Sequence, residues 1–156
     1  MKTNTIYLLT GAAGLLGNSR KAKKLVYVSS TGAIPELPHG EIILEPEILD
    51  AEAVVGYYSK TKALATQIVQ RAVKEHNLDA SIVYPSGICG PNDYAFGPVA
   101  HLIMQYCDGK MSVGFEGSFN SVDVRDLAEG VIACSEKGNV HGCKSGYIAA
   151  QHASPV

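Results

Sequence analysis

The sequence has neither a strong charge of one sign nor a long hydrophobic run. Its 156 residues hold 13 Lys and Arg against 15 Asp and Glu, which leaves a formal charge of −2. This balance gives no electrostatic reason to expect a nucleic acid or an anionic membrane as a partner. No stretch approaches the ~20 apolar residues of a membrane span. Glycines interrupt the apolar start, and no small-x-small cleavage site follows it, so we expect a cytoplasmic protein.

The motifs of several enzyme classes are also missing. No serine lies in a GxSxG pattern, no histidine belongs to HExxH, and Gly109–Lys110 is followed by methionine rather than by the Ser or Thr of a phosphate-binding GxxxxGK[ST] loop. The four cysteines form no CxxC pair and show no metal-ligand spacing, which favours reduced, mostly buried thiols. The sequence therefore gives no support to a serine hydrolase, a nucleoside triphosphatase or a zinc enzyme, and we expect no metal.

Strand-like and helix-like patterns alternate along the chain. Short apolar runs predict strands at Ile6–Leu9, Leu25–Val28 and Ser81–Tyr84, with weaker candidates at Met111–Phe115 and Tyr147–Ala150. Helical periodicity predicts helices at Tyr58–His76, Val99–Cys107 and Asp126–Ser135. Strands that alternate with helices are typical of a parallel sheet with helical crossovers. We predict an α/β protein with a Rossmann-like parallel sheet and flanking helices, in a single domain that spans residues 1–156.

The segment Ile34–Gly56 interrupts this alternation. It contains three prolines and six acidic residues and has little periodicity. A loop of this length inside a compact domain is usually functional or disordered.

The clearest predicted helix, Tyr58–His76, has an apolar stripe and a polar face. The stripe repeats at the helical period and consists of Leu64, Ala65, Ile68, Val69, Ala72 and Val73. Helical rotation places on the opposite, solvated side Lys60, Gln67 and Lys74. Tyr58 and Lys62 are four residues apart and share a face, at the margin of the stripe towards the sheet. A lysine there is costly without a partner, unless its stem carries the charge out to water.

A tyrosine one turn before a lysine suits proton transfer at a hydroxyl or a carbonyl. Tyrosine has an ordinary pKa of about 10, too high for a base at neutral pH, and a nearby ammonium favours the phenolate. A hydroxyl across the site then orients the substrate oxygen. The predicted strand Leu25–Val28 is followed by Ser29, Ser30 and Thr31. Serine and threonine often occur in turns after a strand, but ligands of open α/β sheets bind at the carboxyl ends of strands. Thr31, Tyr58 and Lys62 can therefore serve as the orienting hydroxyl, the acid/base and the nearby ammonium.

Three glycines follow the first predicted strand at GxxGxxG spacing: Gly11, Gly14 and Gly17. Glycines permit a tight turn and let backbone N–H groups approach a pyrophosphate at a helix N-terminus. The spacing alone fits a merely tight strand-to-helix turn equally well. The acidic residue expected ~20 residues further on, which would bind the adenosine ribose, is absent.

Five motifs occur along the chain in the order TGAAGLLG, VYVSST, YSKTK, YPSGICGP and VDVRDLA. In this order they resemble the extended short-chain dehydrogenases/reductases, and among these the NAD-dependent epimerase/dehydratase family, nearest its dihydroflavonol-reductase-like branch. The resemblance runs from Thr5 to about Ala150. It implies a Rossmann-like domain that binds NAD or NADP, and oxidoreductase or epimerase chemistry at a hydroxyl or ketone of a small molecule or nucleotide sugar.

The resemblance also implies roles for individual residues. Thr31 would be the catalytic hydroxyl, Tyr58 the acid/base and Lys62 its partner, which also binds the nicotinamide ribose. Further contacts to the cofactor would come from Gly11, Ala13, Gly14, Leu15, Gly17, Ser29, Pro85, Ser86 and Gly87. Asp123 and Arg125 match a motif that helps to shape the substrate side.

Relative to the resembled family, the chain is incomplete. Only Asn18–Lys24 separates the glycine turn from the hydroxyl strand, where the family has strand–helix units of on the order of 80–90 residues. Either this segment closes a short right-handed crossover between the first two predicted strands, or it joins residues that flank a missing stretch. By the same resemblance, we expect the family's substrate domain beyond Val156 to be missing. These losses leave the choice between NAD and NADP open. They also expose apolar surface that favours self-association, so a homodimer stays open, and an inactive remnant serving as a binding or structural module is the alternative function.

Overall fold

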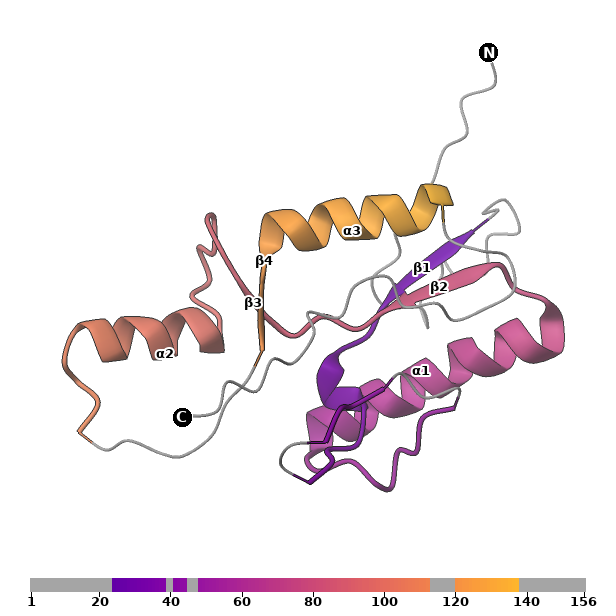
Figure 1. The fold of residues 1–156 in the computed structure, drawn as a ribbon, viewed down its shortest axis with the longest axis horizontal. Helices are drawn as coiled ribbons and strands as arrows, with labels where there is room; N and C mark the ends of the chain where they lie inside the picture. Colours follow the sequence, from indigo (N-terminus) through magenta and orange to yellow (C-terminus); the bar gives the residue numbers. More distant parts are fainter. Residues whose placement is uncertain (1–23, 39–40, 45–47, 113–119, 138–156) are drawn as a thin grey trace, which may run out of the picture.

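The computed structural model describes residues 24–38, 41–44, 48–112 and 120–137 of the chain (Figure 1). Its elements, in chain order, are β1 (Leu25–Val28), the short 3-10 helix η2 (Thr31–Ala33), α1 (Tyr57–His76), β2 (Ala80–Val83), β3 (Gly87–Cys89), α2 (Pro98–Cys107), β4 (Ser121–Asp123) and α3 (Val124–Lys137). Among these helices, none is long and apolar enough to cross a membrane.

β1 and β2 form a parallel pair that runs from Leu25 opposite Ala80 to Val28 opposite Val83. The connection between them includes α1, which packs on one face of the pair, while α3 covers the other face (Figure 1). Parallel strands joined by a helix, with helices on both faces, confirm the predicted α/β class.

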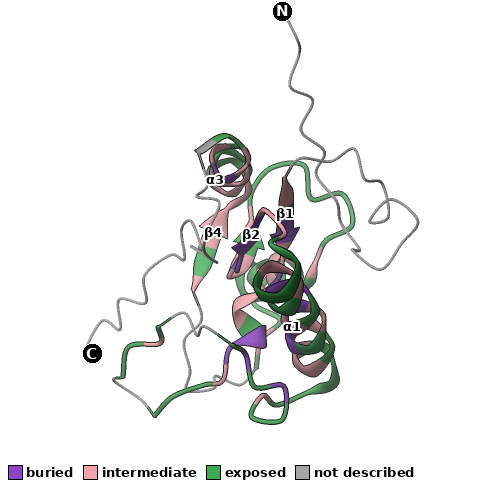
Figure 2. Cartoon of the chain, turned by 90° about the vertical axis from the view of Figure 1, so that its right-hand side faces the viewer, coloured by how far each residue is buried: buried purple, intermediate pink, exposed green. Residues whose placement is uncertain are grey.

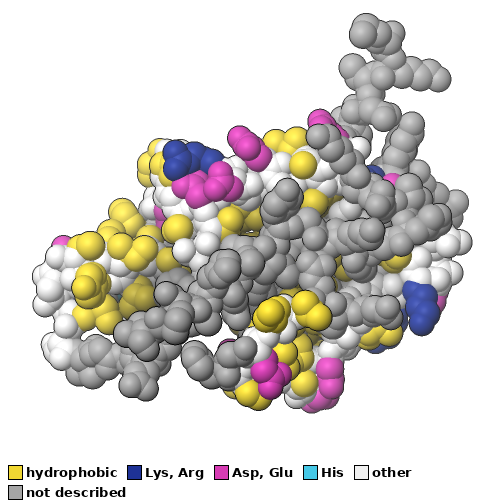
Figure 3. Space-filling view, in the orientation of Figure 1, with side chains coloured by type: hydrophobic (Ala, Val, Ile, Leu, Met, Phe, Trp, Pro, Cys, Tyr) yellow, Lys and Arg dark blue, Asp and Glu magenta, His cyan; other side chains and the backbone are white. Residues whose placement is uncertain are grey.

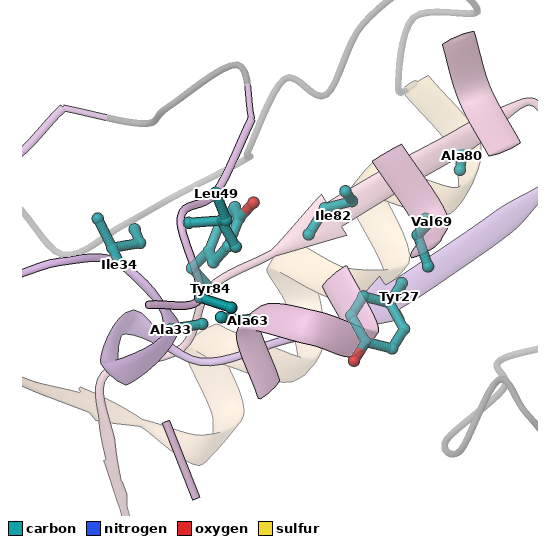
Figure 4. Close-up of a cluster of buried hydrophobic side chains, with 10 residues drawn as sticks. Tyr27, Ala33, Ile34, Leu49, Ala63, Val69, Ala80, Ile82 and Tyr84 are labelled. Atoms are coloured by element: carbon teal, nitrogen blue, oxygen red, sulfur yellow. The ribbon is translucent and has the colours of Figure 1, made fainter. Parts of the chain in front are cut away.

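The side chains of β1 and β2 alternate between the two helix layers, as the pleat of a strand requires. Towards α1, Tyr27 and Ile82 belong to a buried hydrophobic cluster (Figure 4). Towards α3, Val26 and Val83 pack with Cys134. All residues of β2 are buried, which is typical of a parallel strand covered on both faces.

A second parallel pair, β3 and β4, follows β2 in the chain. Gly87 lies opposite Ser121, and α2 lies in the connection between the two strands. α3 starts at Val124, directly after β4. Gly90, just after β3, has a φ of 145°, and a Cβ at this position would come within 2.7 Å of Val124 Cγ1. This turn therefore requires a glycine, both for its backbone conformation and for the close passage of α3.

α2 has no buried residue. Hydrophobic side chains gather over it in Figure 3, and its exposed large hydrophobic residues are Ile103, Met104 and Tyr106. An exposed apolar surface of this kind fits the prediction of self-association, but the oligomeric state stays a prediction.

The buried face of α1 differs from the predicted stripe. α1 begins one residue before the predicted start, and its buried residues are Ala63, Thr66, Val69 and Gln70 (Figure 2). The prediction is wrong for two members of the stripe, because Leu64 is 45% exposed and Ile68 is 66% exposed. The buried face thus includes two polar residues in place of two large apolar ones.

The segment Ile34–Gly56 has no helix or strand in its described residues, as predicted, but it contributes to the core. Ile34, Leu49 and Ala51 are buried in the cluster that includes α1 and β2. Gln70 Oε1 accepts a hydrogen bond from Leu49 N at 3.2 Å, and Gln67 Nε2 donates to Leu49 O at 2.6 Å. The prediction that Gln67 lies on the solvated side of α1 is therefore wrong, because its amide binds this loop.

The other predicted elements compare as follows. β1 has its predicted bounds, and β2 starts and ends one residue earlier than predicted. α2 extends its predicted helix at one end, and α3 extends its predicted helix at both ends. β3 and β4 were not predicted. Met111 and Ser112 are not in a strand. The rest of that candidate lies outside the described residues, as do Ile6–Leu9 and Tyr147–Ala150.

Candidate active site

A turn rich in hydroxyls follows β1 at the carboxyl end of the sheet. The parallel ladder continues past the strand, since Thr31 N donates to Pro85 O at 2.9 Å. The chain then enters η2, and Ser30 Oγ caps this helix by accepting from Gly32 N at 3.2 Å. Thr31 therefore lies at the edge where ligands of open α/β sheets bind.

The first turn of α1 lies against η2. A Cβ at Gly32 would come within 3.3 Å of Ser59 Oγ. Thr31 directly precedes Gly32, and Tyr58 directly precedes Ser59, so the turn and the helix approach each other next to two of the predicted catalytic residues. The chain enters α1 through Gly56, whose φ of 96° favours glycine.

Tyr58 and Lys62 share one face of α1, as their spacing predicts. Tyr58 is 61% exposed, and its ring centroid is 5.9 Å from Lys62 Nζ, within the range of a cation–π contact. Lys62 is half-buried, and its Nζ donates to Val28 O at 3.4 Å. The lysine thus turns back to the end of β1, and its part in a functional pair with Tyr58 stays a prediction.

The Ser29 hydroxyl is buried between β1 and α1. Its Oγ lies 2.7 Å from Thr66 Oγ1, and Thr66 donates to Lys62 O at 2.7 Å. Nearby, burial raises the pKa of Tyr27, a hydrogen bond with Thr66 opposes this shift, and the charge of Tyr58 adds to it. The hydroxyl of Ser29 is therefore bonded within the protein, and its contact with a cofactor stays a prediction.

Pro85, Ser86 and Gly87 connect β2 to β3 beside the hydroxyl turn. Pro85 is buried, and its carbonyl holds the segment to Thr31. Ser86 Oγ is buried and has no hydrogen-bond partner within the described part of the chain. Because a buried hydroxyl without a partner is costly, this atom is suited to a bound group, and the place of this segment near the nicotinamide stays a prediction.

Asp123 and Arg125 form a local ion pair where β4 meets α3. Arg125 Nε donates to Asp123 Oδ1 at 2.9 Å, its Nη2 donates to Oδ2 at 2.6 Å, and its backbone N donates to Oδ1 at 2.8 Å. These hydrogen bonds lower the pKa of Asp123 to about 2. The side-chain bonds with Arg125 have the largest effect, and the bond with its backbone N–H has the next largest. The same pairing raises the pKa of Arg125. This fork fixes Arg125 over the end of β4, and its predicted place on the substrate side stays a prediction.

The predicted contacts at Gly11, Ala13, Gly14, Leu15 and Gly17 lie outside the described residues. In the ranges that the structure does describe, no group of His, Cys, Asp and Glu could hold a metal ion.

Two groups at the site were missed by sequence reasoning. The Val28 carbonyl that accepts from Lys62 is a backbone atom and has no sequence signal. Thr66 follows Lys62 by four residues, which puts both on one face of α1. A polar residue at that position of a helix face turned to the sheet was the signal that could have identified it.

A model of the NAD dependent epimerase/dehydratase family matches residues 9–143. The chain belongs to this family. Its curated relatives include sterol demethylase protein B of Methylococcus capsulatus, 29% identical over 83% of this chain and 40% of that protein. A putative dihydroflavonol 4-reductase of Synechocystis is 29% identical over 82% of this chain and 38% of that protein. This member of the epimerase/dehydratase family thus spans about two-fifths of the length of these relatives.

Solved structures share the fold of this chain. The crystal structure of gox2253 is 32% identical, with a TM-score of 0.68 over 77% of this chain and 36% of that chain. The dTDP-glucose 4,6-dehydratase of Bacillus anthracis, solved in complex with NAD, has a TM-score of 0.60 over 76% of this chain and 38% of that chain. At 22% identity, the second likeness shows the fold alone. The predicted family and the predicted Rossmann-like class are both confirmed.

Proposed function

We propose that residues 1–156 belong to one NAD(P)-binding domain of an oxidoreductase, with Thr31, Tyr58 and Lys62 at its catalytic centre. The observation that carries this proposal is the contact of Lys62 Nζ with Val28 O. In this contact the ammonium lies at the carboxyl end of β1, next to the hydroxyl turn and 5.9 Å from the centroid of the exposed Tyr58 ring. Membership of a family that is named for its use of NAD supports the cofactor.

The described residues fit a dinucleotide of this kind. The carboxyl ends of β1 and β2 meet at the edge where such ligands bind, and the Ser86 hydroxyl there has no partner within the described residues. We assign Ser86, with Pro85 and Gly87, to the nicotinamide end. NAD or NADP, when bound, supplies the hydride acceptor or donor. The glycine turn, with Gly11, Ala13, Gly14, Leu15 and Gly17, and Ser29 at the end of β1 are proposed as further parts of the cofactor cleft.

Tyr58 is assigned to proton transfer. As a phenolate, it takes the proton of a substrate hydroxyl when the alcohol is oxidised; as a neutral phenol, it gives its proton to the carbonyl oxygen when a ketone is reduced and is left as a phenolate. The Lys62 ammonium attracts the negative charge that this transfer puts on the phenol oxygen. The exposure of Tyr58 leaves its oxygen open to a substrate. The hydroxyl of Thr31, on the opposing turn, donates a hydrogen bond to the substrate oxygen and orients it.

The substrate class is a small molecule with a hydroxyl or ketone. The names of the relatives include a dihydroflavonol 4-reductase and a dTDP-glucose dehydratase, which differ widely in the rest of the molecule. What such substrates share is an oxidisable carbinol or a reducible carbonyl, the group on which the three side chains would act.

Isotope transfer tests this function. The 156-residue chain is incubated with NADH or NADPH deuterated at C4 and a panel of ketones, at millimolar cofactor so that weak binding does not hide turnover. We expect deuterium at the carbinol carbon of one product, detected by mass spectrometry, and its loss in Lys62→Met. Thr31→Val is compared with Ser30→Ala in the same assay. Both hydroxyls belong to the turn, but only that of Thr31 is assigned to the substrate oxygen. Deuterium transfer that persists in Lys62→Met would refute the assignment.

A further inference from the structure

Two consecutive residues at the end of β1 bind two residues of α1 that lie one turn apart. The carbonyl of Val28 accepts from Lys62 Nζ at 3.4 Å, and Ser29 Oγ lies 2.7 Å from Thr66 Oγ1. Residues four apart on a helix are neighbours on one face. The contact made by Lys62 and the hydroxyl pair therefore cross the same strand–helix interface side by side.

The proton count fixes the direction of the hydroxyl bonds. Thr66 has a single hydroxyl proton and donates it to Lys62 O at 2.7 Å. The short contact with Ser29 is then a bond in which Ser29 donates and Thr66 accepts. The two side chains are 4% and 0% exposed, respectively. They form a directed chain, from Ser29 through Thr66 to the backbone carbonyl of Lys62.

The contact of Lys62 itself is too weak to set its position. A single N–H···O contact of 3.4 Å lies beyond the usual range for such bonds. The ammonium that makes it is carried on a flexible four-carbon side chain. Among the buried residues of α1, Ala63 and Val69 are apolar and bind without direction. Gln70 is buried and polar, but it binds the loop at Leu49 and not β1. The hydroxyl pair is both buried and directional, and it lies in the turn that follows Lys62.

We propose that Ser29 and Thr66 are positioning residues, which fix the rotation of α1 against β1 and thereby hold Lys62 at the hydroxyl turn. This role rests on the function proposed above for Lys62. Neither hydroxyl is exposed, so neither contacts the substrate. A misplacement of about 1 Å in such a constellation costs on the order of 100-fold in rate.

The test follows the environment of Lys62 by NMR in the 156-residue chain. The lysines are labelled by reductive methylation with 13C, and Lys62→Arg identifies the Lys62 resonance. We expect this resonance to move in Thr66→Val and in Ser29→Ala, and to return towards its original position in Thr66→Ser, which keeps a hydroxyl. The resonance of Lys74, exposed on the same helix, is the internal control and stays in place.

A folded Thr66→Val chain with an unmoved Lys62 resonance would overturn the proposal. If Thr66→Val fails to fold, then Ser29→Ala decides, because it removes the hydroxyl that donates to Thr66 and leaves Thr66 itself unchanged. If Ser29→Ala lowers the stability of the chain but leaves the Lys62 resonance in place, the proposal is also overturned.

Kinetics separate this proposal from the function on which it rests. We expect Thr66→Val to lower kcat about 10–100-fold, with partial rescue in Thr66→Ser. If Lys62→Met keeps full turnover, the proposed function fails, and the NMR result still decides the positioning role. If Lys62→Met loses turnover while Thr66→Val keeps its kcat, the positioning role alone fails.

Discussion

Replacing Leu49 by alanine should destabilise the protein strongly. Leu49 is 1% exposed and lies in the main hydrophobic cluster. The substitution removes three buried carbons, which at ~0.8 kcal/mol each is about 2.4 kcal/mol of transfer free energy. A cavity term is added, and its size depends on how far the surroundings can collapse. Both backbone groups of Leu49 are bonded to glutamines of α1, so the segment is held in place. We therefore expect a loss near the upper end of the usual range, about 3–5 kcal/mol.

Urea denaturation followed by circular dichroism measures this loss, with coincident transitions by fluorescence as the check of two-state behaviour. Ile48→Ala is the matched control. Ile48 is the preceding residue and is 64% exposed, so its truncation should change the free energy of unfolding by no more than ~0.5 kcal/mol. A loss below ~1 kcal/mol for Leu49→Ala, or equal losses for the two variants, would refute the inclusion of this loop in the core.

Three further predictions concern backbone strain and pH. Gly90→Ala should cost at least about 1–3 kcal/mol, because its φ and the nearby Val124 side chain both oppose a Cβ, whereas Gly130→Ala, which meets no atom within 4 Å, should gain about 0.5–1 kcal/mol in α3. Thermal unfolding measures both, and equal effects would contradict the account. Because burial raises the pKa of Tyr27, the unfolded tyrosine ionises first, so stability falls as the pH rises above about 10. The fall should be shallower in Tyr27→Phe, and identical slopes would argue against the burial of this hydroxyl. Asp123 has a pKa lowered to about 2, so its contribution to stability is present above its ordinary pKa of 3.8 and is lost as the pH falls towards 2. Carboxyl 13C titration should give this low midpoint, and Arg125→Gln should return it towards 3.8; a midpoint unaffected by Arg125→Gln would exclude the ion pair.

The sequence was sufficient for the elements with a strong local pattern. β1 and β2 are short apolar runs rich in β-branched residues, and α1 has helical periodicity over its full length, so their positions were predicted to within one residue. β3 and β4 are three residues each. Strands this short have too little pattern of their own, and their pairing with each other defines them.

The buried face of α1 could not be predicted for a different reason. Leu64 and Ile68 have the apolarity of core residues, whereas Thr66 and Gln70 do not. Thr66 and Gln70 are buried because their bonding partners, Ser29 and Leu49, lie 37 and 21 residues away in the chain. Partners at this distance become neighbours only when the strand, the loop and the helix have packed together. The same holds for the candidate site. The spacing of Tyr58 and Lys62 could be recognised in the sequence, but the Val28 carbonyl that accepts from Lys62 could not.

The central claim, that Tyr58 transfers the proton, is tested most directly by comparing Tyr58→Phe with Tyr57→Phe. The two tyrosines are adjacent in the first turn of α1 and both are exposed, so each variant removes one exposed phenolic oxygen from the same turn, while consecutive side chains of a helix point in different directions. The measurement is the turnover number at millimolar NADH or NADPH, with a ketone that accepts deuterium in the isotope assay. We predict that Tyr58→Phe lowers turnover by about 10²–10⁴-fold, as the loss of a general acid does, while Tyr57→Phe keeps the turnover of the unmodified chain. Equal turnover in the two variants would contradict the account.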